Sequence, residues 1–216
     1  MSKSIYSLVL NDQLVSMLDK VAYKRGLSRS NMINTILAEY LSFETPEKRF
    51  ENIFKCMETL VEQTQSLKFV SQQSPNLAAI CSAISFRYNP TVKYGIELFA
   101  YDDGVKMELK VSLRSTNPKL LFEINNFYWL FLALEEKYLG KIDCNIDGGR
   151  YLRRFFIEGD DVFDCEILGN AITDYIKTFD YLLNLYFSNL NFGEKISNII
   201  EIEYLKNLKK DNLLLK

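Results

Sequence analysis

The chain has 216 residues, of which 48% are hydrophobic and 25% are charged, and its formal net charge is −2. This length allows one small domain and one of ordinary size. The chain contains no histidine, which excludes His-dependent catalytic triads and zinc sites of the usual Cys/His spacing. Residues 1–49 carry seven Lys and Arg against five Asp and Glu, whereas the remainder carries 19 against 23. This mild asymmetry permits DNA contact by the N-terminal part only.

The first forty residues predict one strand followed by two helices. Apolar and outward positions alternate over residues 5–10, which is the period of a strand. Asn11 can cap a helix that Gly26 ends, since glycine readily adopts the left-handed conformation beyond a helix C-terminus. Ser28 can cap a second helix that runs to about residue 41.

A segment of this size buries too little surface to fold alone, and its single strand has no neighbour in the sequence. We therefore expect a twofold dimer, in which the strand pairs antiparallel with its copy. Four helices, two from each chain, would then cover one face of the paired strands. The side chains under them would be Tyr6, Leu8 and Leu10.

This order of elements resembles the ribbon-helix-helix DNA-binding proteins, the group that contains the Arc and MetJ repressors. The matching residues are the strand 5–10, the turn 10–14, the break at Gly26-Leu27, and Ser28-Arg29-Ser30 at the start of the second helix. The resemblance covers about the first fifth of the chain. It implies an intertwined dimer that lays a two-stranded ribbon in the major groove of double-stranded DNA.

The resemblance also implies which residues contact DNA. The positions that match the base-reading strand residues are Ile5, Ser7 and Val9, although the family usually has polar or basic residues there. A serine can hydrogen-bond to a base, whereas the two apolar residues can only contact groups such as a thymine methyl. The positions that match phosphate contacts, or could flank them, are Lys3, Lys24, Arg25, Ser28, Arg29, Ser30 and Asn31. Two other interpretations remain open: an ordinary buried strand and helix cap, and a dimer used only for assembly.

Residues 45–74 predict a connecting helix. Thr45 can cap it, Pro46 fits its first turn, and apolar residues recur at spacings of three and four as far as Leu67. We favour contact of this helix with its copy in the dimer, as a rigid connector between domains. The alternative is a helix that packs on its own C-terminal domain.

Residues 75–216 predict an α+β domain. Three strands alternate cleanly over residues 80–88, 92–100 and 105–113, and a second hairpin joins 142–146 to 151–157. A helix from Asn117 to Gly140 is apolar nearly all round, which is typical of a central helix. Two further helices follow over 167–190 and 196–208. We expect an antiparallel sheet of about five strands with helices on one face.

The polar face of this sheet could bind an anion or a nucleic acid, with Phe99 and Tyr101 as stacking platforms. The simpler interpretation, a solvated face of mixed charge, is the one we favour. The charged residues assigned to it are Arg87, Lys93, Glu97, Lys106, Glu108, Lys110 and Arg114. Three further cations lie on the second hairpin: Arg150, Arg153 and Arg154. No metal site, cofactor or enzyme motif is predicted, because the chain has no Gly-rich phosphate loop, serine-nucleophile motif or paired-carboxylate motif.

The sequence therefore predicts a dimeric, sequence-specific DNA-binding protein, and specifically a transcriptional repressor. Its partners would be double-stranded DNA, a second copy or larger assembly of itself, and a small molecule or protein effector at residues 75–216. The longest apolar run, Phe127–Leu134, is too short for a membrane span, so a cytoplasmic protein with reduced cysteines is expected. The alternative is an assembly protein of the antitoxin or plasmid-maintenance type, whose large domain binds a protein.

Overall fold

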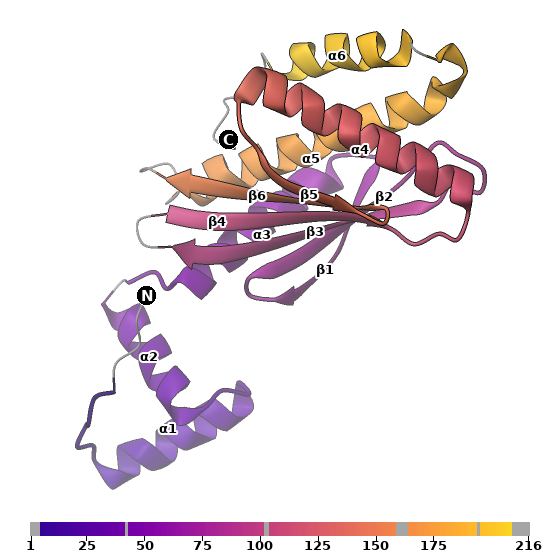
Figure 1. The fold of residues 1–216 in the computed structure, drawn as a ribbon. Helices are drawn as coiled ribbons and strands as arrows, with labels where there is room; N and C mark the ends of the chain where they lie inside the picture. Colours follow the sequence, from indigo (N-terminus) through magenta and orange to yellow (C-terminus); the bar gives the residue numbers. More distant parts are fainter. Residues whose placement is uncertain (1–4, 42, 102–103, 159–163, 194, 209–216) are drawn as a thin grey trace. The chain divides into compact units, whose positions relative to one another are not determined.

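The computed structural model describes residues 5–41, 43–101, 104–158, 164–193 and 195–208. The chain divides into a small unit, Met1–Arg49, and a large unit, Phe50–Lys216 (Figure 1). Each unit has its own core, and each is described by itself below.

The small unit contains two helices, α1 (Asp12–Lys24) and α2 (Arg29–Tyr40). Asn11 caps α1 by accepting a 2.8 Å hydrogen bond from the Gln13 amide, and Ser28 caps α2 by accepting from the Asn31 amide at 3.3 Å. Gly26, between the helices, has a φ of +65°, a conformation that costs other residues strain. The predicted caps, the glycine break and both helices are therefore confirmed.

The predicted strand at residues 5–10 does not form within the chain. The segment has no regular secondary structure, and the first regular element is α1. Tyr6, Leu8 and Leu10 are 82%, 61% and 37% exposed. A strand needs a hydrogen-bonded partner, and the described residues of this unit supply none. The structure thus does not support the ribbon-helix-helix arrangement as such, and pairing with a second copy stays a prediction.

The helix predicted over 45–74 is shorter than expected. Thr45 caps α3 (Pro46–Glu62) as predicted, by accepting from the Lys48 amide at 3.3 Å. The helix ends where the amide and hydroxyl of Thr64 both donate to the Val61 carbonyl, at 2.9 and 2.7 Å. The rest of the predicted helix includes a strand, β1 (Leu67–Ser74). Two register shifts against the next strand, between Phe69 and Ser74, interrupt the alternation that would have indicated a strand. Leu67 also fits the helical spacing of the apolar residues before it, so the helix was predicted to continue.

The apolar face of α3 lies in the core of the large unit. Five of its residues are at most 4% exposed and belong to the same cluster as the buried residues of the sheet: Phe50, Ile53, Phe54, Met57 and Val61. The interpretation of this helix as a connector that pairs with its copy is therefore wrong. The alternative, a helix packed on its own domain, is correct.

The large unit is built on a six-stranded antiparallel sheet with the strand order β1-β2-β3-β4-β6-β5. The α+β prediction is confirmed, with one strand more than expected. The predicted strand over 80–88 lies earlier, at 77–83, and its pairing with the next strand ends at Ala83. Residues 84–90 instead form an irregular connection, in which Tyr88 and Asn89 adopt positive φ values. The other strands are β2 (Leu77–Ala83), β3 (Thr91–Tyr101), β4 (Gly104–Leu113), β5 (Asp143–Asp147) and β6 (Arg150–Glu158).

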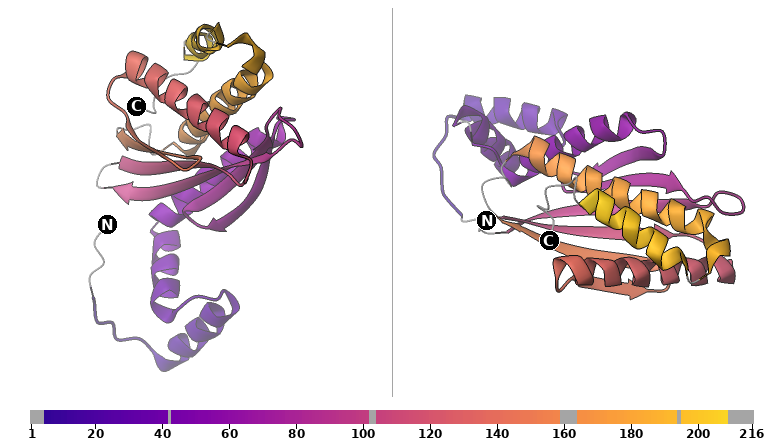
Figure 2. Two further views of the ribbon diagram at one scale, coloured as in Figure 1. Left: turned by 45° about the vertical axis from the view of Figure 1, so that its right-hand side comes forward. Right: turned by 90° about the horizontal axis from the view of Figure 1, so that it is seen from above.

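Helices α4, α5 and α6 gather on one side of this sheet (Figures 1 and 2). Burial alternates along the central strands, so one face lies under the helices and the other faces solvent. The aromatic rings of Phe131 and Phe179 lie 4.6 Å apart between centroids, and Phe179 also contacts Tyr94 and Tyr151 of the sheet. These helices are α4 (Pro118–Leu139), α5 (Cys165–Ser188) and α6 (Lys195–Leu208), with a short 3-10 turn, η2 (Leu190–Phe192), before α6.

The contact between α3 and α5 gives a test of where α3 packs. A Cβ atom on Gly169 would lie 3.1 Å from Cβ and Sγ of Cys56 and 3.3 Å from the Ile53 carbonyl. Helix propensity alone would make Gly169→Ala stabilising by about 1 kcal/mol. We expect the opposite, a loss of about 1–2 kcal/mol, because the two helices must move apart.

Chemical denaturation of the full chain measures this difference. Asn170→Ala, at the exposed neighbouring position, is the matched control and should change stability by less than about 0.5 kcal/mol. A Gly169→Ala variant more stable than the parent chain would contradict the packing of α3 on α5.

Candidate nucleic-acid interface

The turn between α1 and α2 brings together three of the predicted phosphate contacts. Lys24 and Arg25 end α1, Arg29 begins α2, and all three are exposed. Ser30 and Asn31 are exposed in the first turn of α2, while Lys3 lies outside the described residues. A helix N-terminus with nearby cations is a favourable place for an anion.

Two of these cations already have carboxylate partners. Arg29 donates from Nε and Nη2 to the two carboxylate oxygens of Asp19, both at 2.7 Å. The Asp19 hydrogen bond raises the pKa of Arg29, and the Arg29 hydrogen bond lowers the pKa of Asp19. Arg25 Nη1 lies 3.9 Å from Glu39 Oε1. A phosphate group at Arg29 would therefore have to replace or share the Asp19 carboxylate.

The predicted base-facing residues are fully accessible. Ile5 and Val9 are 100% and 103% exposed, and Ser7 is exposed as well. The structure thus leaves these side chains free of the rest of the described small unit. It does not bring them into one rigid surface, because residues 5–10 form no strand.

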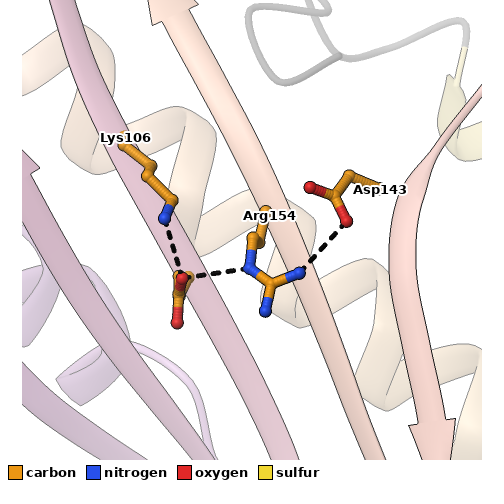
Figure 3. A network of polar contacts seen from close by, with 4 residues as sticks. Lys106, Asp143 and Arg154 are labelled. Carbon is orange, nitrogen blue, oxygen red and sulfur yellow. Dashed lines mark hydrogen bonds and ion pairs between the residues drawn. The ribbon is translucent and has the colours of Figure 1, made fainter. Parts of the chain in front are cut away.

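The solvent-facing side of the large sheet carries a network of ion pairs (Figure 3). Glu108 Oε1 accepts from Lys106 Nζ at 3.0 Å and from Arg154 Nε at 3.1 Å, and Arg154 Nη1 reaches Asp143 Oδ1 at 3.2 Å. The Lys106 hydrogen bond, and then that of Arg154, lowers the pKa of Glu108. These cations mainly satisfy carboxylates on the same face. This agrees with the interpretation of a solvated surface of mixed charge.

Arg153, a cation of the second hairpin, does not lie on this polar face. It points to the same face of β6 as Tyr151 and Phe155, the face under the helices, and it is 0% exposed. Its guanidinium forms an ion pair with Glu135 of α4, which is also fully buried, and lies 4.3 Å from the centroid of the Phe155 ring. The alternation of β6 could have revealed the inward position of Arg153. Nothing in the apolar pattern of α4 marked Glu135 as its partner.

Two tyrosines complete this buried cluster. The Tyr151 hydroxyl donates to Glu135 Oε2 at 2.8 Å, and the Tyr175 hydroxyl donates to Oε1 at 3.0 Å. Burial raises the pKa of Tyr175 to about 12, so it stays protonated and keeps donating. Because Glu135, Arg153 and Tyr151 are each 0% exposed, a substrate could reach them only if the core opened. Their arrangement is that of a structural network.

A second buried carboxylate, Asp180 of α5, joins that helix to the sheet. Its Oδ1 accepts hydrogen bonds from the Ser82 hydroxyl and, at 2.7 Å, from the Tyr94 hydroxyl. Asp180 is 3% exposed, and this burial raises its pKa despite the two hydrogen bonds. No pattern in the sequence indicated this pair of contacts, since its members are nearly one hundred residues apart.

Comparisons with known proteins add no assignment: no family model, no curated protein and no solved structure matches the chain. Among the described residues, no group of His, Cys, Asp and Glu could hold a metal ion. Within the same residues, no helix is both long enough and apolar enough to span a membrane. Asp164, part of an acidic stretch, instead caps α5 by accepting from the Glu166 and Ile167 amides at 2.8 and 3.1 Å.

The raised pKa of Asp180 predicts a specific pH dependence. A carboxyl group with a raised pKa in the folded state stabilises the fold most when it is protonated, below its ordinary pKa, and this contribution is lost as pH rises through the folded-state pKa. Asp180→Asn keeps one oxygen to accept from Ser82 and Tyr94 but cannot ionise. We expect its stability relative to the parent chain to increase from about pH 3.5 to pH 7.

Denaturation midpoints of both proteins across this range check the prediction. Asp174→Asn serves as the control, because Asp174 is on the same helix and is only partly buried. A difference between Asp180→Asn and the parent chain that is independent of pH would contradict it.

Proposed function

We propose that this chain is a dimeric, sequence-specific DNA-binding protein that acts as a transcriptional repressor in the cytoplasm, with an N-terminal ribbon-helix-helix domain. The local structure of the small unit supports this. A capped helix, a left-handed glycine and a second capped helix follow residues 5–10 in the order and spacing of that family. The large unit, in this proposal, adds contacts between copies or binds an effector.

The observation that carries the proposal is the small core of this unit. Only Leu18, Ala22 and Met32 are buried within its described part, with Ile33 packed against them. Large apolar side chains on the extended segment and on both helices are more than one third exposed: Ile5, Tyr6, Leu8, Val9, Leu10, Leu14, Met17, Val21, Tyr23, Leu27, Ile36, Leu37, Tyr40 and Leu41. Monomeric units of this size rarely leave so many large apolar side chains exposed. A second copy of the same unit would cover it and would give residues 5–10 a strand to pair with.

The paired strands would then turn Ile5, Ser7 and Val9 outward as one ribbon. In the major groove, Ser7 would hydrogen-bond to a base edge, and the two apolar side chains would contact thymine methyl groups. The cations around the α1–α2 turn would meet phosphates on either side of the groove. Arg29 would exchange the Asp19 carboxylate for a phosphate oxygen, which suits its planar, bidentate guanidinium.

A second candidate is an assembly protein of the antitoxin or plasmid-maintenance type. The specific observation in its favour is that Arg29 is already paired with Asp19, while two of the three outward positions of the ribbon are apolar. In that case the small unit would serve mainly for dimerisation, and the large unit would bind a protein. Binding to duplex DNA at low salt separates the two candidates.

Arg29 gives the most direct test of DNA binding. We expect the full chain to bind random duplex DNA at low salt and to release it steeply as salt rises. Arg29→Ala should weaken binding to all sequences and lower the salt slope by about two, one phosphate contact per copy of the dimer. Fluorescence anisotropy of a labelled duplex over a salt series measures both effects.

Two control variants separate charge from readout. Asp19→Asn removes the carboxylate that competes for Arg29 and should strengthen binding to all duplexes. Ser7→Ala should chiefly change the preference among sequences. If the parent chain ignores duplex DNA even at low salt, the DNA-binding proposal fails and the assembly function stands.

Neighbouring residues of the extended segment test the ribbon itself. Leu8→Lys places a charge under the helices of the proposed dimer and should weaken DNA binding by at least about tenfold. Val9→Lys, on the opposite face of the same strand, should bind DNA at least as tightly as the parent chain. Equal losses in the two variants would rule out a strand with one covered and one DNA-facing side.

A further inference from the structure

Helix α4 carries a regular stripe of exposed residues on its outer side. Phe122 and Trp129 are 64% and 58% exposed, although they are large aromatic residues in the middle of a long helix. The other members are also exposed, and the intervals along the chain are three, four, three, four and three residues: Lys119, Phe122, Asn126, Trp129, Ala133 and Glu136. This is the spacing of the a and d positions of a coiled coil.

The stripe lies opposite the side of α4 that packs on the sheet. At 100° per residue, the buried residues Ile124, Phe127 and Phe131 point one way, and Phe122, Trp129 and Ala133 point nearly the opposite way. The neighbouring parts of the fold touch the flanks of α4: Lys137 pairs with Glu201 of α6 at 2.6 Å, and Asn125 accepts from the Gly149 amide of the β5–β6 turn at 3.3 Å. Within the stripe, the side chain of Asn126 also hydrogen-bonds with Tyr186 of α5. Within the described part of the chain, the two exposed aromatic side chains, Phe122 and Trp129, have no ring or cation–π partner.

We propose that this stripe pairs antiparallel with the same stripe of a second copy, about a twofold axis between residues 127 and 128. The stripe is self-complementary about this axis, because its six residues form three pairs whose members are equally far from residues 127 and 128 along the chain. Phe122 then faces Ala133 of the second copy, a large side chain against a small one. Asn126 faces Trp129, so that the indole N–H can donate to the amide oxygen. Lys119 faces Glu136, and a and d positions meet as antiparallel coiled coils require.

Complementarity of charge and size identifies the occupant as a second copy of this chain. In a parallel pair, Lys119 would face Lys119 and Glu136 would face Glu136, and the two aromatic positions would also meet their own kind. Only the antiparallel arrangement satisfies all three pairs of positions at once. This contact goes beyond the proposed DNA-binding function and does not depend on it, since it lies wholly within the large unit.

The test reverses the charges at the two ends of the stripe. Lys119→Glu and Glu136→Lys each replace two attractive contacts by two repulsive ones, so each variant alone should associate at least about tenfold more weakly at low salt. An equal mixture of the two variants should recover the association of the parent chain. In the mixed pair, the carboxylate introduced in one copy faces the ammonium introduced in the other, and the two unchanged residues face each other as before.

Trp129 is the only tryptophan of the chain and reports on this surface directly. As full-length protein associates, its emission should shift to the blue and acrylamide should quench it less. Lys119→Glu alone should lose this concentration dependence, and the mixture should regain it. Lys55→Glu, a charge reversal on the exposed side of α3, should behave as the parent chain does.

The fluorescence distinguishes this contact from a dimer held through the small unit. An associated parent chain whose Trp129 remains as accessible as in dilute solution, with no effect of the charge reversals, would overturn the proposal even if DNA binding holds. A parent chain that stays monomeric with an exposed Trp129 would overturn it too. Conversely, loss of DNA binding with the fluorescence pattern intact would remove the proposed function and leave the α4 contact standing.

Discussion

A sheet with helices on only one face constrains nearly every residue of the large unit. Side chains of one parity must lie under the helices, and those of the other parity remain in solvent. Most inward positions are apolar, but Arg153 and Ser82 are not, and each therefore needs a partner brought from a helix. Glu135 of α4 and Asp180 of α5 supply these partners. The two buried carboxylates thus fix the helices to the sheet at defined points, since an ion pair or hydrogen bond tolerates less displacement than an apolar contact.

The same constraint is absent from the small unit. Two short helices have no sheet to pack on, and their shared core consists of three buried side chains within the described residues. The exposed apolar residues that remain are too numerous for a stable monomeric unit of this size. The buried carboxylates of the large unit find partners within that unit, whereas the small unit leaves many large apolar side chains exposed within its described residues. This contrast is the physical reason for proposing that the small unit dimerises.

The sequence predicted those features that depend on local pattern. Capping residues, glycine breaks and the strict alternation of β3 and β4 each indicate one structure, and helices α1, α2, α3 and α4 begin where their caps predicted. Strand β1 could not be predicted in the same way, because its bulges hide the period of two and Leu67 fits the helical spacing before it. The partners of Arg153 and Asp180 depend on packing between distant segments, which no local pattern records. The candidate DNA contacts were partly predictable: the sequence indicated the helix caps near them, but it did not indicate the pairing of Arg29 with Asp19.

The outer side of α4 shows how burial and periodicity carry different information. Periodicity alone indicated a helix enclosed on all sides, because its apolar residues nearly encircle it. Burial divides these residues into an inner face that meets the sheet and an outer stripe whose aromatic side chains, Phe122 and Trp129, are more than half exposed. The two proposed self-complementary contacts, one in each unit, would restrict the assembly through symmetry. If both join the same two copies, their twofold axes must coincide and the assembly closes as a dimer. If the axes differ, each copy contacts two others and the contacts propagate until a ring or a larger oligomer closes.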